Sequence, residues 1–253
     1  MKIQYCSDLH LEFPDNKEYL KNNPINPIGD ILILAGDIIP MLLIEEHSCF
    51  IDELAAKFDT VYWLLGNHEY YYYNMLQLPS PVHKSIRPNV FLVNNVSVVK
   101  QHVKFVFTTL WSHIRPQNQF YVQQRLSDFQ VIGNGRDVLQ PEDYKQLHKD
   151  SLSFLKKEMK QSDSKKHVVV THHVPTYEHY PARYKGGILN EAFATELGNY
   201  ISKSKADYWI YGHHHHNPED FMIGKTTLVT NQLGYVKSNE HLLFDSNKII
   251  QIN

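Results

Sequence analysis

Four consecutive histidines, residues 213–216, could bind a metal ion. They follow the apolar stretch 207–211, which has the composition of a buried strand, and residues 217–253 continue beyond them. A histidine run inside a globular chain is unlike a terminal tag and indicates a site at a strand end. Because side chains alternate along an extended segment, His213 and His215 would converge on one point. Two such imidazoles suit a transition-metal ion, and the alternative is a surface cluster in a histidine-rich chain.

Metal-binding side chains also follow the other strand-like stretches. They are Asp8 with His10, Asp37, Asn67 with His68, and His172. Ligands of open α/β sheets bind outside the carboxyl ends of the strands, so these side chains would share one edge. Each fragment alone is weak: an Asp after a strand is usually part of a turn, and His172 could be a core histidine. Their joint occurrence at strand ends predicts a single site.

The residue types suit a centre with two metal ions. A carboxylate such as Asp37 has two oxygens and can bridge two cations, while Asn67 offers a neutral amide oxygen and the histidines offer nitrogens. This mixed set favours Mn, Fe, Zn or Co over Ca or Mg, so the expected cofactors are two divalent transition-metal ions. Without cations, Asp8 and Asp37 would be like charges held close together at a cost in free energy.

The elements that would position these residues are short apolar runs separated by helical patterns. Runs at 2–7, 30–35 and 60–65, with helical spacing at 45–58, predict parallel strands joined by crossover helices. Further strands are expected at 90–93, 97–100, 103–110, 167–171, 206–211 and 226–230, helices at 141–160 and 189–203, and a hairpin near 242–252. Neither a repeat nor a linker interrupts the pattern, so we expect one domain over residues 1–253, an α/β sandwich of two sheets.

Composition narrows the class of protein. The chain has 253 residues, a formal net charge of −2, 16 histidines and two cysteines. Two cysteines imply no disulfide framework, and the lack of a long basic stretch argues against a dedicated nucleic-acid binder. Neither a signal peptide nor an apolar run of the ~20 residues that span a bilayer is present, so we expect a cytoplasmic enzyme without a membrane partner.

Taken in order, the fragments resemble the signature of the calcineurin-like metallophosphoesterases. That signature is DxH, GDxx, GNH[DE], a histidine after a strand, and GHxH; here it reads DLH, GDII, GNHE, THH and GHHH over residues 8–215. The stretches TTLWS (108–112), SDF (127–129), THHVP (171–175) and NQLGY (231–235) resemble a bacterial branch of that family. The resemblance implies a four-layer α/β/β/α sandwich with two mixed sheets and a binuclear metal centre.

The resemblance also implies roles for individual residues. One metal would be held by Asp8, His10, Asp37 and His215, and the other by Asp37, Asn67, His172 and His213, leaving His214 and His216 as neighbours. Two cations ~3.5–4 Å apart can hold a bridging hydroxide that attacks phosphorus in line. His68 resembles the family's catalytic histidine, which would protonate the leaving group or stabilise the charge of the transition state.

The expected activity is hydrolysis of phosphomonoesters or small phosphodiesters, so the expected partner is a small phosphate ester. The alternative is a cyclic-nucleotide phosphodiesterase or nuclease of the same family. A scaffold that had lost its metals would lack ligands, and none is missing here.

The sequence departs from part of the family at Pro40. Protein-phosphatase relatives have an acidic residue there that orients the catalytic histidine, so the departure argues against protein-phosphatase activity and leaves the support of His68 open. The long excursion 111–136 is expected to border the substrate through its aromatic and charged residues, which are Trp111, His113, Arg115, Phe120, Tyr121, Arg125 and Asp128. A surface lid that packs its aromatics on the core is the alternative. His148 and Tyr235 resemble further rim residues.

Overall fold

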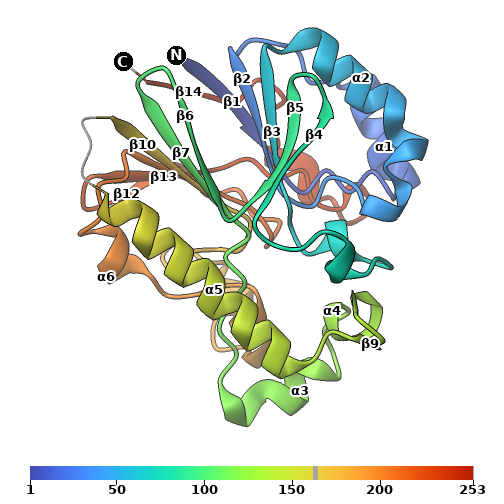
Figure 1. Ribbon diagram of the computed structural model, residues 1–253, viewed down its shortest axis with the longest axis vertical. Helices are drawn as coiled ribbons and strands as arrows, with labels where there is room; N and C mark the ends of the chain where they lie inside the picture. Colours follow the sequence, from blue (N-terminus) through green and yellow to red (C-terminus); the bar gives the residue numbers. More distant parts are fainter. Residues whose placement is uncertain (162–164, 253) are drawn as a thin grey trace.

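Two mixed sheets pack face to face in the computed structural model, which describes residues 1–161 and 165–252 (Figure 1). The first sheet has the order β14-β1-β2-β3-β5-β4 and consists of β1 (Lys2–Cys6), β2 (Ile31–Ala35), β3 (Thr60–Leu64), β4 (Val82–Arg87), β5 (Val90–Asn94) and β14 (Ile249–Gln251). The second has the order β12-β13-β11-β10-β7-β6 and consists of β6 (Val96–Lys100), β7 (Val103–Thr108), β10 (Lys166–Thr171), β11 (Tyr208–Tyr211), β12 (Phe221–Ile223) and β13 (Thr226–Thr230).

Both sheets have the same plan, with four parallel central strands and an antiparallel strand at each edge. Helices cover the two outer faces. The longer helices are α1 (Pro14–Asn22) and α2 (Ser48–Lys57), which lie on the first sheet, and α5 (Pro141–Lys160), which lies on the second together with the single-turn α6 (Gly198–Ile201) (Figure 1). The four-layer α/β/β/α sandwich with two mixed sheets is therefore confirmed.

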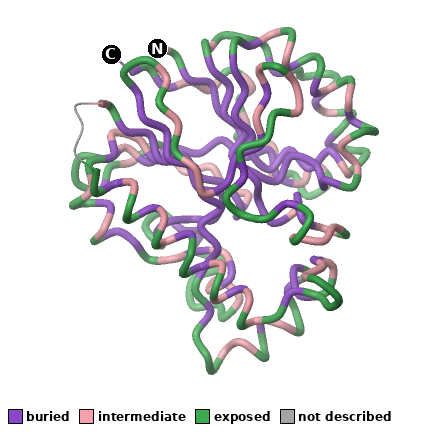
Figure 2. The backbone as a smooth tube through the Cα atoms, in the orientation of Figure 1, coloured by how far each residue is buried: buried purple, intermediate pink, exposed green. Residues whose placement is uncertain are grey.

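The central strands are buried on both faces, which explains their unbroken apolar sequences. In β2, Ile33 faces the core between the sheets, whereas its neighbours Leu32 and Leu34 face the core beneath α1 and α2. Figure 2 shows the burial as purple strands at the centre, with exposed residues on the outer elements. A strand of this kind cannot slide or flip without exposing apolar surface, so its carboxyl end is held in a fixed position.

Two expected elements are wrong. Residues 189–203 do not form one helix: a 3₁₀ turn at Ile188–Ala192 is followed by an extended stretch that pairs with the backbone of Val174 and Pro175, and only then by α6. Backbone pairing thus overrides the helical period of the apolar residues. The hairpin near 242–252 is absent from the described residues, because β14 pairs with β1 as an edge strand.

The stretch 112–140 is not a structureless loop. It contains α3 (Gln119–Gln123), α4 (Asp128–Val131) and the short pair β8 (Gly133–Asn134) and β9 (Asp137–Val138), and it extends away from the sheets in Figure 1. Short 3₁₀ turns occupy Met41–Leu43, Glu45–His47, His68–Tyr70, Met75–Gln77, Pro116–Asn118, Ala182–Tyr184, Val236–Ser238 and Glu240–Leu243. Among the described residues, no helix has the length and apolarity needed to cross a bilayer.

Candidate metal centre

The structure brings together all seven residues expected to bind metal, at the carboxyl ends of the central strands of both sheets. They are Asp8 after β1, Asp37 after β2, Asn67 after β3, His172 after β10, and His213 with His215 after β11, joined by His10. Hydrogen bonds tie the loops to one another, both between the two sheets and within the second sheet. The backbone N–H of His213 donates to Asp8 Oδ1 at 3.0 Å, and the N–H of Gly212 donates to the carbonyl of His172 at 2.9 Å.

The loops reach these positions through left-handed backbone, not through extended strands. The φ angles are 54° at Asp8, 47° at His10, 56° at Asp37, 81° at His213 and 48° at His215. Non-glycine residues rarely adopt this conformation, and they do so most often at functional sites. Strand alternation would send His213 and His215 to one point, and this expectation is wrong: the two side chains enter two neighbouring clusters.

The first cluster consists of Asp8, His10 and His215. Nδ1 of His10 lies 3.0 Å from Glu12 Oε1, and Nδ1 of His215 lies 2.7 Å from Glu240 Oε2. A carboxylate can only accept, so both Nδ1 atoms carry the proton and both Nε2 atoms present a lone pair. The two Nε2 atoms are nevertheless only 3.0 Å apart, and Asp8 Oδ1 lies 3.4 Å from that of His215. Such a group of acceptors fits a cation at its centre.

The second cluster consists of Asp37, Asn67, His172 and His213. Nδ1 of His172 donates to the carbonyl of Ala35 at 2.9 Å, which leaves its Nε2 as an acceptor. That Nε2 faces three further atoms at 3.1 Å each, namely Asn67 Oδ1, Asp37 Oδ2 and His213 Nδ1. The amide nitrogen of Asn67 donates to Asp128 at 2.9 Å, which turns the amide oxygen towards the cluster. Here too, oxygen and nitrogen acceptors converge on one point and fit a cation.

Asp37 links the two clusters. Its Oδ2 lies 3.1 Å from His172 Nε2 and 4.0 Å from His10 Nε2, a position from which a carboxylate can serve two cations. The close approach depends on glycine. A Cβ atom at Gly66 would lie 2.2 Å from Asp37 Oδ1, and one at Gly36 would lie 2.3 Å from His172 Nδ1. The glycines of the GD and GNH fragments therefore make room for the ligands.

The pKa values of the cluster histidines are shifted by the carboxylates around them, and the shifts favour a positive charge in each cluster. Burial lowers the pKa of His172, but the carboxylates of Asp37, Asp8 and Glu69 together raise it to about 9. Burial likewise opposes protonation of His215, whose pKa is raised to about 10 by its hydrogen bonds to Asp8 and Glu240. For His213, burial and the neighbouring His173 and His172 both lower the pKa. A proton can thus stand in for a cation at one nitrogen in each cluster.

A buried glutamate fixes the loops beneath the second cluster. The Glu69 carboxylate accepts from the backbone N–H groups of Asp37, Ile38 and Gly66 and from Trp63 Nε1, at 2.6–2.9 Å. Four donors satisfy a buried carboxylate, which then joins the loop after β2 to the loop after β3. Glu69 is the last residue of the GNHE fragment, but its role becomes evident only from the fold.

Three acidic residues that support the ligands were not assigned this role from the sequence: Glu12 behind His10, Glu240 behind His215, and Asp128 behind Asn67. For two of them the sequence contained a feature that could have indicated this role. Glu12 continues the alternation of Asp8 and His10, and Asp128 belongs to the quoted SDF stretch. Glu240 had none, because it comes from a 3₁₀ turn just after the NQLGY stretch.

A cavity of about 390 Å³ opens above the two clusters. Asp37, Asn67 and the histidines form its floor, and His68 lines it together with Tyr71 and Tyr235. Its other lining residues come from two segments of the chain: Arg125, Leu126 and Ser127, and Tyr180, Tyr184, Leu189, Asn190 and Phe193. His214, expected to be a neighbour only, is buried, contacts Gln232 and also lines this cavity.

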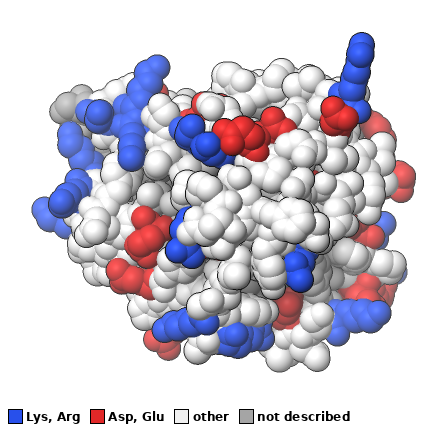
Figure 3. Space-filling model, turned by 90° about the horizontal axis from the view of Figure 1, so that it is seen from below, with Lys and Arg blue, Asp and Glu red and all other residues white. Residues whose placement is uncertain are grey.

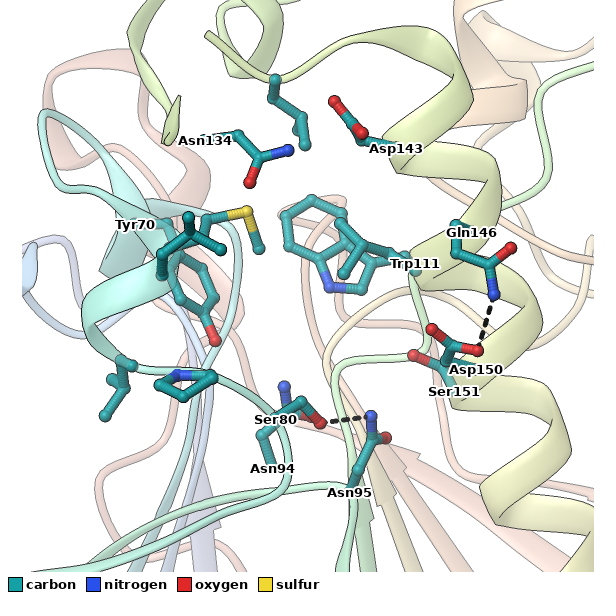
Figure 4. Close-up of a pocket in the computed structure, with 16 residues that line it drawn as sticks. Tyr70, Ser80, Asn94, Asn95, Trp111, Asn134, Asp143, Gln146, Asp150 and Ser151 are labelled. Carbon is teal, nitrogen blue, oxygen red and sulfur yellow. Dashed lines mark hydrogen bonds between the residues drawn. The ribbon is translucent and has the colours of Figure 1, made fainter. Parts of the chain in front are cut away.

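Only a few residues of the excursion 111–136 line the cavity above the metal centre. Arg125 lines the cavity, but Trp111 is 1% exposed and packs on Tyr144, with ring centroids 5.1 Å apart. Figure 4 shows its indole in a separate pocket of about 250 Å³, between Tyr70 and the helix that carries Asp150. Tyr235 lines the cavity above the metal centre, as expected of a rim residue, whereas His148 lines a third pocket with Arg115.

Comparison with known proteins agrees with this geometry. The profile of the calcineurin-like phosphoesterase family matches residues 1–217. The chain is 26% identical to an uncharacterised protein, L509, of Acanthamoeba polyphaga mimivirus over 277 aligned positions, which span 99% of this chain and 96% of that protein. The fold is similar to that of phosphopantetheinyl hydrolase from Mycobacterium tuberculosis, with a TM-score of 0.67 and 16% identity over 93% of this chain and 90% of that one.

The chain belongs to the calcineurin-like phosphoesterase family, because the family profile covers most of its length, including all seven cluster residues. Membership and the two clusters support a metal-dependent hydrolase that acts on phosphate esters. They also suggest divalent metal ions as its cofactors, without distinguishing between metals.

Proposed function

We propose that this protein hydrolyses phosphomonoesters or small phosphodiesters at a centre of two divalent transition-metal ions. The observation that carries the proposal is the convergence of imidazole nitrogens and carboxylate oxygens into two clusters that share Asp37, beneath a cavity of about 390 Å³. A cavity of this size is typical of small-molecule sites.

The residues of the first cluster would hold one ion and those of the second cluster the other, with Asp37 common to both. Bound ions of this kind polarise a phosphate ester and lower the pKa of a water molecule, so that hydroxide is available near neutral pH. The chain itself contributes rigidity. Backbone donors fix Asp8 and Asp37, since the N–H of His68 donates to Asp37 Oδ1 at 2.9 Å and that of His213 to Asp8.

His68 is the proposed catalytic residue. It lines the cavity, its Nδ1 is engaged by Glu12 at 2.9 Å, and its Nε2 therefore remains for the substrate. Burial lowers its pKa, but the Asp37 and Glu12 carboxylates raise it above the ordinary value overall. When the bond between phosphorus and the leaving oxygen breaks, Nε2–H of His68 would protonate that oxygen.

The cavity walls favour a small ester with a flat or apolar group. Tyr180, Tyr184 and Phe193 supply rings, and Arg125 supplies a cation. Lys and Arg are interspersed with Asp and Glu on the face seen in Figure 3, which suits a small substrate better than a long polyanion. The second candidate is a cyclic nucleotide, because the aromatic rings could stack on a base.

The test is turnover of phosphomonoesters, cyclic nucleotides and simple phosphodiesters by metal-stripped protein, with Mn, Fe, Zn or Co added back one at a time. We expect hydrolysis of at least one ester class that requires metal and is lost in Asp37→Asn. That variant, purified in the same way, also controls for contaminating phosphatases. Equal turnover in the variant, or none in the native protein with any metal, would contradict the proposal.

A further inference from the structure

A catalytic histidine needs a partner that fixes its ring, and Pro40 offers no side-chain acceptor where some relatives have an acidic residue. Ring orientation matters because a proton donor has to lie within hydrogen-bond reach of the leaving oxygen. A carboxylate for this purpose is therefore expected somewhere else along the chain.

Glu12 has the required geometry. Its Oε1 lies 2.9 Å from Nδ1 of His68 and 3.0 Å from Nδ1 of His10. One oxygen thus accepts from the proposed catalytic histidine and from a histidine of the first cluster. Only 14% of the Glu12 side chain is exposed, so water competes little for these two bonds.

The face of the His68 ring is fixed as well. Tyr71 stacks on it, with ring centroids 3.9 Å apart and an angle of 22° between the planes. The Tyr71 hydroxyl donates to Asp128 at 2.9 Å, and Asp128 also accepts from Asn67 of the second cluster. With its face held by Tyr71 and its Nδ1 edge held by Glu12, the ring has only Nε2 left to meet a substrate.

Stability alone is a poor explanation for Glu12. Its second oxygen, Oε2, is buried without a hydrogen-bond partner among the described residues. A buried polar atom without a partner costs free energy, and such atoms in native structures call for a particular explanation. A carboxylate kept there in spite of that cost fits a role in the reaction.

We propose that Glu12 is a positioning residue that holds His68 with Nε2 towards the ester and couples this orientation to His10 of the first cluster. The role rests on the proposed function, since it presumes that His68 protonates a leaving group. Glu12 itself touches neither substrate nor reacting atoms. It takes the place of the acidic partner that the Pro40 side chain cannot provide.

The test compares Glu12→Ala with Glu240→Ala. Both variants remove a carboxylate behind a first-cluster histidine, but only the first removes the partner of His68. With metal restored to saturation, Glu12→Ala should lose about 10–100-fold more turnover on an alkyl phosphate than on 4-nitrophenyl phosphate, whose leaving group departs without a proton. Glu240→Ala should lose the same factor on both esters.

A second readout does not depend on activity. In metal-free protein labelled with ¹⁵N-histidine, His68 should show a hydrogen-bonded Nδ1–H and a single ring orientation in the native chain and in Glu240→Ala, and an average of ring forms in Glu12→Ala. The His68 signals are assigned from His68→Gln. If Glu12→Ala does not fold, the isosteric Glu12→Gln should shift both readouts in the same direction by a smaller amount.

Unchanged His68 ring signals in Glu12→Ala, or equal losses on the two esters, would overturn the role of Glu12. Failure of the proposed function looks different, because the native protein would then hydrolyse neither ester with any metal. In that case the ring signals would still decide whether Glu12 holds His68.

Discussion

The two clusters use similar ligands but are supported by different groups. In the first cluster both imidazoles donate to carboxylates, Glu12 behind His10 and Glu240 behind His215. In the second cluster His172 donates to a backbone carbonyl, and Nε2 of His213 is buried without a partner among the described residues, beneath the ring of Phe193. The histidines of the first cluster are thus backed by carboxylates, whereas those of the second cluster are not.

This difference bears on metal affinity. A carboxylate behind a ligating histidine fixes the ring and raises its basicity, and such partners are worth 10–100-fold in affinity or activity. We therefore expect the first cluster to hold its ion more tightly, so that a chelator removes the ions in two steps and empties the second cluster first. Asp37 belongs to neither side of this comparison, because its Oδ2 approaches histidines of both clusters.

The largest effect is expected for Asp37→Asn. This variant should empty both clusters and so abolish the difference in metal affinity between them. The amide removes the shared charge and places a donor among acceptors, so turnover should fall by more than the ~10²–10⁴-fold typical of losing a general acid. Metal content by plasma emission spectrometry is the measurement. The control is His216→Ala, because His216 lies beyond both clusters with its ring against His214. Two equivalents of metal in Asp37→Asn would refute the shared role.

His68→Ala should separate chemistry from metal binding. The His68 side chain contacts the first cluster through Glu12 and through the ring of His10, with centroids 4.4 Å apart, whereas Asp37 is held by the backbone N–H, which the substitution keeps. The variant should keep both ions and lose ~10²–10⁴-fold in turnover on alkyl esters. Metal content and steady-state kinetics on the same preparation check this. Loss of an ion would instead place His68 among the groups that hold the metals.

Glu240→Ala should narrow the difference in metal affinity between the two clusters. Removing the acceptor of His215 Nδ1 is expected to weaken metal binding at the first cluster by about 10–100-fold and to leave the other step of a chelator titration in place. The matched variant is Asp128→Ala, which frees the Asn67 amide and should weaken the second cluster instead. If both variants shift the same step, the two clusters are not independent in the way their supports suggest.

The sequence was sufficient to predict the strands and the ligand residues that follow their carboxyl ends. Short apolar runs indicated the central strands, and residues such as Asp8, Asp37 and His172 were then expected to meet at one edge. It was insufficient where the chain leaves regular structure. Left-handed backbone at His213 and His215 places their side chains in different clusters, as the family resemblance implied and strand alternation did not.

The sequence pattern also could not predict contacts made by segments that are distant along the chain. Glu240 reaches His215 from a turn with no motif of its own, and the extended stretch after Ala192 formed because the backbone of Val174 was available for pairing. Both depend on contacts between segments that local patterns do not contain.

The smallest effect concerns substrate binding at the cavity wall. Arg125 and Arg115 lie on the same excursion, yet only Arg125 lines the cavity above the metal centre. Its guanidinium lies 3.8 Å from the centroid of the Tyr121 ring and makes one hydrogen bond, of 3.4 Å, to the Tyr121 carbonyl, which leaves most of its donors for a substrate. Arg115 is instead bound by Glu191, with Nε–Oε1 at 2.6 Å.

Arg125→Ala should therefore raise KM by about tenfold, the order of one hydrogen bond to a charged group, with little change in kcat. Arg115→Ala, the matched control, should leave both constants unchanged. Because neither arginine touches a cluster, metal content should match that of the native protein in both variants, and the two clusters should still empty in the same order. A fall in kcat at constant KM would mean that Arg125 acts on the transition state, and equal kinetics in the two variants would make the excursion a structural lid.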